Sequence, residues 1–213
     1  MIVFHFGVDG NMLHYWAFDT HGWPLVLFMR LGQFLFLGLV GVSVFLSSRG
    51  FKAQSVRGLK IFGCGLLVTA GTYLVFPHDY VRFGVLHLIG VSVPLLALFK
   101  GRELWALLAA AGFYGVSFVL PAVELSSSWT LPFGLPPEHF SSLDYFPIFP
   151  WMAVPLCGLW LASKLYAQRK ETALAIFAKV PGSRWLGRHS LAVYLLHQPI
   201  LYFSLWGLSH WIS

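Results

Sequence analysis

The segment Pro24–Leu46 reads PLVLFMRLGQFLFLGLVGVSVFL and carries one charged side chain, Arg30. Its 23 residues are enough for a helix that crosses the hydrocarbon core of a bilayer, which needs roughly 20 apolar residues. Water does not hydrate that core, so the backbone N–H and C=O groups of a spanning segment must bond to each other within a helix. The segment therefore predicts a transmembrane helix.

Five further apolar segments follow along the rest of the chain. Hydrophobic residues make up 57% of the sequence and charged residues 10%, too few charged side chains to cover a water-facing surface. The runs do not alternate and are too long for the strands of a membrane β-barrel. We therefore expect an all-α, polytopic transmembrane helix bundle with six full spans, of which the other five are Leu59–Phe76, Val81–Phe99, Leu104–Val123, Ile148–Ala167 and Leu191–Leu208.

The amino end carries a shorter apolar segment. Met1–Val8 cannot span a bilayer, and Asp9-Gly10-Asn11 is expected to end it. It lacks the basic region and the small-residue cleavage site of a signal peptide. We interpret it as a partial or truncated first span, with a half-inserted segment as the alternative. The whole chain, residues 1–213, is predicted to be a single integral membrane domain.

The charged residues indicate how the bundle is oriented. Twelve of the fourteen Lys and Arg residues lie in the connections Arg49–Lys60, Lys100–Arg102 and Lys164–Arg188, which alternate along the chain and so share one side. The positive-inside rule makes that side cytoplasmic. The net charge of +6 then reflects membrane topology, and no motif of a nucleic-acid-binding protein accompanies it. The opposite side receives Asp9, Asp19, Asp79, Glu124, Glu138, Asp144, His14, His21, His78 and His139.

Two other features concern lipid and metal. The connection Gln168–Arg188 has the pattern of a basic amphipathic helix, which is expected to rest on anionic lipid. Cys64 and Cys157 both lie in predicted helices without metal-ligand spacing. We interpret them as small apolar fillers and expect no metal site.

Polar side chains within the spans point to candidate sites, because burying them is costly unless they are paired or used. Arg30 lies about 9 Å below the predicted outer surface at 1.5 Å per residue. It either snorkels toward water, or it pairs with a carboxylate or faces a substrate cavity. Arg82 lies at the mouth of a span, and His87 lies about one and a half turns deeper. For His87 a structural role and a catalytic or substrate-binding role both remain open.

The last span carries Tyr194, His197 and Gln198, followed by Pro199. Proline removes a helix hydrogen bond, which predicts a kink beside these side chains. They would then line a cavity near the middle of the membrane, or else hydrogen-bond to neighbouring helices.

The densest polar and aromatic patch is His14–Trp23, which contains Asp19 and His21. A histidine with a nearby carboxylate commonly acts as a general base. Aromatic residues at a membrane surface are also ordinary belt residues. Both interpretations therefore stay open.

Four segments give the chain a resemblance to a known family. They are Tyr15–Trp23 with the following helix to Ser47, Tyr80–Gly90, Asp144–Trp151 and Gly187–Pro199, and their order and spacing cover nearly the whole chain. The sequence resembles the catalytic domain of the heparan-alpha-glucosaminide N-acetyltransferase family, in its small bacterial form, among the multi-spanning acyltransferases. It departs from that family in the start of the first helix, which lacks the usual Arg and Asp, and in having fewer helices than the lysosomal members.

The resemblance implies a membrane acyltransferase in a bacterial-type inner membrane. Acetyl-CoA would be the cytoplasmic co-substrate, and an amino or hydroxyl group of a sugar or cell-envelope glycan would be acylated on the far side. The family's proposed catalytic histidine lies in the outward loop after the first helix, and His21, in the pattern Tyr-Trp-x-Phe-x-x-His-x-Trp, matches it. His14 competes for that role. The histidine would act as a general base or as a transient acyl carrier.

The candidate residues fall into two groups. The candidate catalytic residues are His21, His14, Asp19 and His87. The candidate substrate- or acyl-CoA-binding residues are Arg30, Arg82, Asp144, Tyr145, Trp151, Tyr194, His197 and Gln198. For the CoA phosphates the predicted cytoplasmic side offers Arg49, Lys52, Arg57, Lys60 and Arg188.

Two rival functions stay in view. One is a haem-binding electron carrier whose ligands would come from His5, His87 and His197. The other is a transporter or a lipid or small-molecule binder that uses the same cavity without chemistry. The expected partners are the lipid bilayer, acyl-CoA and the glycan acceptor, with no nucleic acid; a homodimer is left open.

Overall fold

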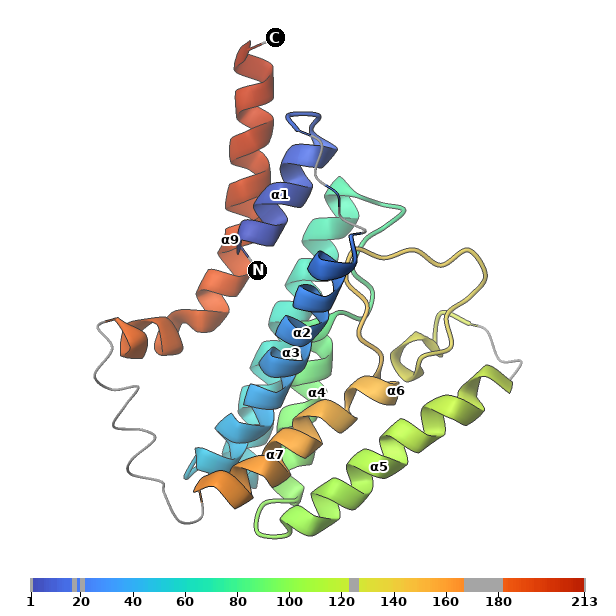
Figure 1. Cartoon of the computed structure of the whole chain (residues 1–213), viewed down its shortest axis with the longest axis vertical. Coiled ribbons are helices and arrows are strands. Elements are labelled where there is room, and N and C mark those ends of the chain that lie inside the picture. The colour runs from blue at the N-terminus through green and yellow to red at the C-terminus, as the bar shows by residue number, and fades with distance from the viewer. Residues whose placement is uncertain (1, 17–18, 20–21, 123–126, 167–181, 213) are drawn as a thin grey trace. The chain divides into compact units, whose positions relative to one another are not determined.

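A computed structural model describes residues 2–16, 19, 22–122, 127–166 and 182–212 (Figure 1). These residues are helical apart from loops and one isolated bridge between Phe83 and Tyr145. They belong to two compact units. Unit 1 comprises Met1–Gln33 with Lys170–Ser213, and unit 2 comprises Phe34–Arg169. The all-α fold class predicted from the sequence is confirmed.

Unit 1 brings the amino end of the chain to its last helix. α1 spans Ile2–Met12, and α9 spans Ser183–Ile212. The two helices lie beside each other (Figure 1). α2, Trp23–Leu46, begins in unit 1 and continues into unit 2.

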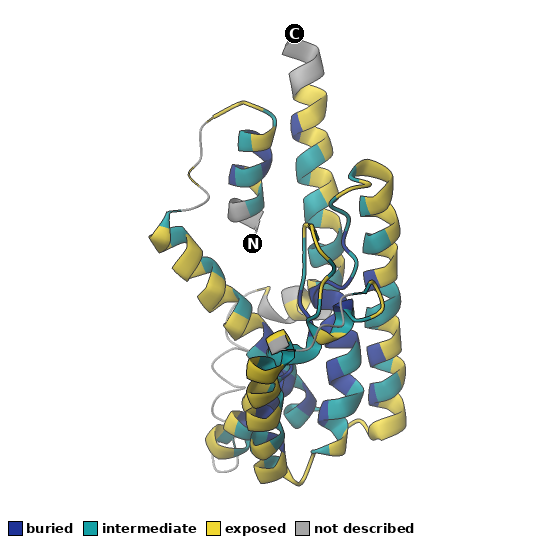
Figure 2. Ribbon diagram, turned by 90° about the vertical axis from the view of Figure 1, so that its right-hand side faces the viewer, coloured by how far each residue is buried: buried dark blue, intermediate teal, exposed yellow. Residues whose placement is uncertain are grey.

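Unit 2 contains two helix pairs beside the second half of α2. α3 (Phe51–Val75) packs against α4 (Val85–Leu98), and α5 (Glu103–Val119) packs against α7 (Ala153–Tyr166). Buried side chains fill the interior while the outward faces are exposed (Figure 2). The segment between α5 and α7 contains the short elements η1 (Leu120–Ala122), η2 (Leu131–Phe133) and α6 (Ile148–Trp151).

Glycines let helices of unit 2 approach each other closely. A Cβ atom added to Gly41 of α2 would lie 2.1 Å from the Pro155 carbonyl oxygen of α7. One added to Gly58 of α3 would lie 2.5 Å from the Gly90 carbonyl oxygen of α4. Small residues at crossings are typical of helices in lipid, where burying a larger apolar side chain gains little over leaving it against lipid tails.

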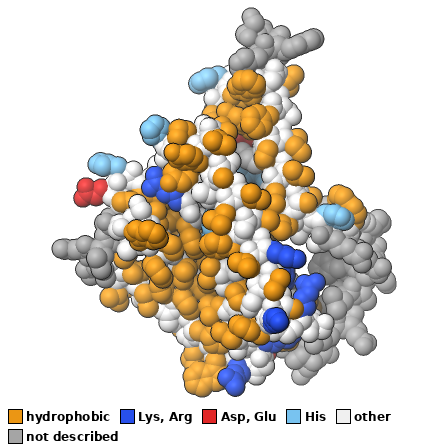
Figure 3. All heavy atoms as spheres, turned by 180° about the vertical axis from the view of Figure 1, so that it is seen from behind, with side chains coloured by type: hydrophobic (Ala, Val, Ile, Leu, Met, Phe, Trp, Pro, Cys, Tyr) orange, Lys and Arg blue, Asp and Glu red, His pale blue; other side chains and the backbone are white. Residues whose placement is uncertain are grey.

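Four of the described helices are long and apolar enough to cross a membrane: α2, α3, the continuous α6–α7 segment Ile148–Tyr166, and residues His189–Leu208 of α9. α4 and α5 are apolar but shorter, with 14 and 17 residues. Large apolar side chains point away from the bundle (Figure 3), and Leu74 of α3 is 82% exposed. Such a surface suits lipid rather than water. The chain is an integral membrane protein.

Two predicted boundaries at the ends of spans are wrong. α1 does not end at Asp9-Gly10-Asn11 but continues to Met12, and the Asp9 side chain within it is paired with Gln198 of α9. α3 begins at Phe51, so the basic residues up to Lys60 lie on its first turns and not in a connection. Long basic side chains tolerate this position because they extend toward the polar surface from the end of a span.

The predicted span Val81–Phe99 also begins too early, since α4 starts only at Val85. At the other end of the chain, α9 runs on past Pro199 as one helix. The predicted amphipathic helix Gln168–Arg188 lies largely outside the described residues, and its part from Ser183 onward belongs to α9.

Candidate active site

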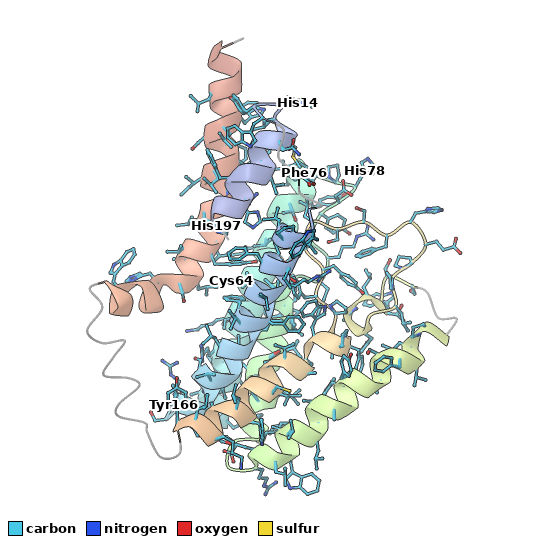
Figure 4. All side chains as sticks on the ribbon, in the orientation of Figure 1. His14, Cys64, Phe76, His78, Tyr166 and His197 are labelled. Atoms are coloured by element: carbon cyan, nitrogen blue, oxygen red, sulfur yellow. The ribbon has the colours of Figure 1, made fainter. Side chains whose placement is uncertain are left out.

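The first group of predicted residues lies where α9 meets α1 in unit 1. Residues four apart on a helix share a face, and His5 and Asp9 of α1 are related in this way. The His197 ring packs against the His5 ring, with centroids 5.2 Å apart and planes inclined by 59°. The Gln198 amide donates to the two carboxylate oxygens of Asp9, at 3.0 and 3.3 Å. We call these four residues the α1–α9 seam; Figure 4 labels His197.

The Asp9–Gln198 pair helps to hold α1 against α9. An isolated helix of 11 residues is marginal, because too few hydrogen bonds offset the cost of nucleation. Asp9 is 3% exposed, and a buried carboxylate is costly unless it accepts hydrogen bonds. The Gln198 amide supplies them, so the pair ties α1 to α9.

Hydrogen bonds to its own helix indicate which nitrogen of the His197 ring carries the hydrogen. Its Nδ1 lies 2.6 Å from the Tyr194 carbonyl oxygen and 3.2 Å from that of Val193. A carbonyl oxygen only accepts, so Nδ1 carries the hydrogen and the lone pair of the neutral ring is on Nε2. That Nε2 is buried and has no hydrogen-bond partner among the described residues, and the same is true of Gln198 Oε1. The seam therefore contains two unfilled acceptors.

The loop after α1 lies against both helices. Trp16 Nε1 donates to the Gly7 carbonyl at 3.1 Å, and the Tyr15 hydroxyl donates to the Leu205 carbonyl of α9 at 2.9 Å. His14 is exposed and has a positive φ of 63°. Asp19 is exposed and accepts the Gly22 N–H at 3.1 Å. His21, the histidine matched by resemblance, lies outside the described residues.

Two other candidate residues, Arg30 and Tyr194, also lie in unit 1. Arg30 is exposed on α2, and its Nη1 donates to Gln33 Oε1 at 3.3 Å. Tyr194 lies one turn before His197 on α9, with ring centroids 5.7 Å apart. Tyr194 is thus close to the seam.

The second group of predicted residues lies at the amino end of α4 in unit 2. Asp144 Oδ2 accepts the Val85 N–H at 2.9 Å, which satisfies one of the amide groups that a helix leaves free at its start. A Cβ on Gly84 would lie 2.2 Å from that oxygen, so only glycine leaves room for the carboxylate. The Phe146 N–H donates to the Phe83 carbonyl at 3.0 Å beside the bridge. Two of the segments that carry the resemblance are joined here.

His87 is buried beneath this contact, with 2% exposure. Its Nδ1 accepts the Gly84 N–H at 3.2 Å, and its Nε2 lies 3.5 Å from Thr69 Oγ1. Because Nδ1 accepts, Nε2 carries the hydrogen of the ring. The Phe62 ring meets the imidazole edge-on, at 5.1 Å between centroids, and the Phe83 ring stacks on it at 5.5 Å. Both nitrogens of His87 are thus engaged by the protein.

Arg82 is held by aromatic rings. Its guanidinium carbon lies 4.8 Å from the centroid of the Tyr80 ring and 5.3 Å from that of Phe140. Both contacts have the geometry of cation–π interactions. Its Nε is buried, and within the described part of the chain it has no hydrogen-bond partner. Sequence reasoning found Arg82 but missed the two rings.

The loop around Asp144 holds the remaining predicted residues. Burial raises the pKa of Asp144 to about 6, although the Val85 N–H works against the shift. Burial also raises the pKa of Tyr145 to about 12, and the Tyr145 hydroxyl donates to the Leu131 carbonyl at 2.8 Å. Trp151 packs against Phe146 at 4.7 Å between ring centroids. Tyr145 and Trp151 therefore brace the loop and α6.

The structure thus divides the predicted site into two sets. Tyr194, His197 and Gln198 meet α1 in unit 1, while Asp144, Arg82 and their neighbours form the end of α4 in unit 2. Sequence reasoning did not place His5 and Asp9 in the site. The signal for them was present, since two polar residues four apart in an apolar run mark one face of a helix that needs a partner.

The same contacts bear on the haem alternative. Haem iron needs its axial imidazoles on opposite sides of the macrocycle. The His5 and His197 rings instead pack directly against each other. Both nitrogens of His87 are hydrogen-bonded within unit 2. None of these arrangements presents a histidine pair to a haem.

Comparison with known proteins gives the chain a family. The sequence model of heparan-alpha-glucosaminide N-acetyltransferase, catalytic, matches residues 1–199. No curated protein and no solved structure was found to match. The matched range contains the α1–α9 seam and the whole of unit 2. Because the match covers most of the chain, the protein belongs to the heparan-alpha-glucosaminide N-acetyltransferase catalytic family, as its sequence segments had indicated.

Proposed function

We propose that this chain is an acyltransferase embedded in a bacterial-type inner membrane. It moves an acetyl group from cytoplasmic acetyl-CoA to an amino or hydroxyl group of a sugar or glycan on the extracytoplasmic side. The observation that carries the proposal is the family match over residues 1–199, in a chain whose helices are apolar enough to span a bilayer. The α1–α9 seam supports it too, because polar side chains on apolar helices are costly and commonly tied to function.

The basic residues support a cytoplasmic donor. Lys52, Arg57 and Lys60 lie on the first turns of α3, and Lys100 donates to the Ser47 carbonyl at the end of α2. These cations lie where the CoA phosphates would need them if this side faces the cytoplasm. Arg57 is partly engaged, since its Nη2 donates to Ser43 Oγ at 3.1 Å. Lys52 and Lys60 are exposed.

The chemistry requires a base. The nitrogen or oxygen of the acceptor attacks the thioester carbonyl, and its proton must leave, a task suited to a histidine with a pKa near neutrality. His21 and His14 of the outward loop are the candidates that the family likeness suggests, with Asp19 as a carboxylate partner. An arginine such as Arg30 or Arg82 would stabilise the oxyanion. Direct transfer and an acetyl-histidine intermediate both satisfy this scheme.

Single-turnover transfer tests the proposal. Purified protein in lipid nanodiscs receives radiolabelled acetyl-CoA with a panel of amino sugars and cell-envelope glycans, beside His21→Ala and His14→Ala. We expect CoA release and acceptor labelling in the wild type and a loss of both in one loop variant. Folded wild-type protein that binds the sugars but never releases CoA would instead be a binder or transporter, and the proposal would be wrong.

A further inference from the structure

Arg82 lies in the connection between α3 and α4 of unit 2, shortly after Phe76 and His78, which Figure 4 labels. Its side chain is partly exposed, but its Nε is buried and has no hydrogen-bond partner among the described residues. A guanidinium carries five N–H donors and no acceptor, and most buried polar atoms in native proteins have a partner. The group that fills this donor must therefore supply an acceptor.

The protein gives the guanidinium aromatic neighbours instead of an oxygen. Its central carbon lies 4.8 Å from the centroid of the Tyr80 ring and 5.3 Å from that of Phe140. A ring attracts the cation, but it does not replace the oxygen acceptor that an N–H group needs. Asp144, on the same loop as Phe140, accepts the Val85 N–H and is not paired with Arg82. The arginine is thus held in place while its hydrogen-bonding capacity stays available.

Further rings hold the two that contact Arg82. The Tyr80 ring meets the Tyr73 ring of α3 edge-on, with centroids 5.1 Å apart. The Phe140 ring meets the Tyr145 ring in the same way at 4.8 Å. A group that is already held in its binding position loses little freedom when a ligand arrives. The cluster of aromatic rings therefore prepares the guanidinium for a ligand.

The two segments that supply these residues are joined by backbone hydrogen bonds. The Leu143 N–H donates to the Asp79 carbonyl at 2.7 Å, and the Phe146 N–H donates to the Phe83 carbonyl at 3.0 Å. Both segments belong to unit 2. The surroundings of Arg82 are thus formed within one compact unit.

We propose that Arg82, held by the Tyr80 and Phe140 rings, binds an oxyanion carried by the sugar acceptor, either a phosphate or a carboxylate group. This inference rests on the proposed function and adds to it the charge of the acceptor. The planar guanidinium matches two oxygens of either group, and such charge-assisted hydrogen bonds are short and strong. An oxyanion only accepts, which is what the unfilled Nε requires.

The role of Arg82 leaves the reaction itself unchanged. His21 or His14 remains the base, and Arg30 remains the arginine for the oxyanion that forms during transfer. Arg82 holds the acceptor at a group that does not react, so no bond to that group forms or breaks. Binding energy from such a remote group orients the amine or hydroxyl that attacks the thioester.

Equilibrium binding without acetyl-CoA tests the inference apart from the reaction. The full chain in phosphatidylcholine nanodiscs is titrated with glucosamine, glucosamine 6-phosphate and 2-amino-2-deoxyglucuronate, and calorimetry gives each Kd. Arg82→Gln removes the positive charge and the two-pronged donor. Arg102→Gln is the matched control, because Arg102 is an exposed arginine of the same unit that lies beyond the other end of α4.

We expect the wild type to bind at least one of the two anionic sugars roughly ten- to hundred-fold more tightly than glucosamine, since hydrogen bonds between charged groups are the strong ones. The sugar that is preferred identifies the oxyanion. Arg82→Gln should lose this preference with little change for glucosamine, and Arg102→Gln should keep it. Equal affinity of the wild type for all three sugars would overturn the inference, as would a preference that persists in folded Arg82→Gln.

Lipid headgroups are a second source of phosphate, and a change of lipid distinguishes them. The titrations are repeated in nanodiscs that contain phosphatidylglycerol, at an ionic strength that screens the charge of the lipid surface. The preference of the wild type should be unchanged. If phosphatidylglycerol abolishes it, Arg82 binds lipid phosphate and the inference is wrong.

Folding and the proposed function are read out separately. Arg82→Lys is a second variant that keeps the charge but not the planar fork, and it should bind the preferred sugar several-fold more weakly. Unfolding temperatures show whether each variant folds; if neither does, Arg82 supports the loop alone and the inference is overturned. Arg82-dependent sugar binding without acetyl transfer would refute the proposed function and leave the binding site standing. Acetyl transfer without Arg82-dependent binding would do the reverse.

Discussion

The amino end of α4 in unit 2 and the α1–α9 seam in unit 1 each enclose a histidine, and the two rings are used differently. His87 accepts the Gly84 N–H at Nδ1 and lies against Thr69 through Nε2. His197 donates from Nδ1 to its own helix and leaves Nε2 unfilled. A buried histidine is thus informative only once the partners of both nitrogens are known.

The difference predicts unequal contributions to stability. At the amino end of α4 the His87 ring accepts from an amide that the helix leaves free, and it is packed by Phe62 and Phe83. In the seam the Nδ1–H of His197 only adds to carbonyl oxygens of its own helix. Loss of the first ring should therefore cost more stability than loss of the second.

The largest expected effect on stability is at His87. His87→Leu leaves the Gly84 N–H buried without an acceptor and removes the partner of Thr69, so we expect a loss of about 2–4 kcal/mol. His197→Leu should cost about 1 kcal/mol or less, because replacing an unsatisfied polar group by an apolar one is close to neutral. Unfolding in detergent, followed by circular dichroism, measures both. Equal losses would contradict the contrast between the two rings.

The next largest effect is expected at Gly84. A Cβ there would lie 2.2 Å from Asp144 Oδ2, so Gly84→Ala must displace the carboxylate from the Val85 N–H. We expect a loss of about 1–3 kcal/mol. Gly112→Ala is the matched control, since nothing lies within 4 Å of its added Cβ on α5. It should be neutral or slightly stabilising, because alanine favours a helix over glycine. Similar losses at both positions would show that the close approach at Gly84 is unimportant.

In the seam, Asp9 tests what holds α1 against α9. Asp9→Leu leaves the Gln198 amide without its acceptor, and we expect a loss of about 1–2 kcal/mol of stability. Asp9→Asn keeps an acceptor for Gln198 and should restore most of that stability. Unfolding in detergent, followed by circular dichroism, measures both variants. Equal stability of Asp9→Leu and the wild type would mean that this pair does not hold the two helices together.

The helices were predictable because lipid leaves few choices. Each of the six predicted spans contains a helix, and Pro24–Leu46 agrees with α2 to within one residue at its start. Four of the described helices are long enough to cross a membrane, so six full spans are not confirmed. Two of the boundaries that failed lie beside distant partners. At the start of α4, Asp144 accepts from Val85, 59 residues away. Near the end of α1, Asp9 pairs with Gln198, 189 residues away. No local pattern encodes such contacts.

The candidate site was predictable as a set of residue types but not as an arrangement. Sequence reasoning selected both His87 and His197 because polar groups in apolar helices are costly. It had no means to rank them, since their difference lies in which atom faces each ring nitrogen. For His87 one such atom is Thr69 Oγ1, 18 residues away on another helix. For His197, no atom of the described residues bonds to Nε2.

The smallest expected effect is the pH dependence that Asp144 gives to the α4 end. Burial raises its pKa from 3.8 to about 6 in the folded protein, so between these values the folded state binds more protons than the unfolded state. Stability should then fall as pH rises from about 4 to 6 and stay level above it. We expect about 1 kcal/mol, because the half-buried carboxyl is partly screened by solvent. Asp144→Asn keeps an oxygen for the Val85 N–H and should flatten this slope, measured as unfolding temperature from pH 4 to 8. A slope that persists in Asp144→Asn would assign the titration to another group and leave the carboxylate at the α4 end with the role of an acceptor alone.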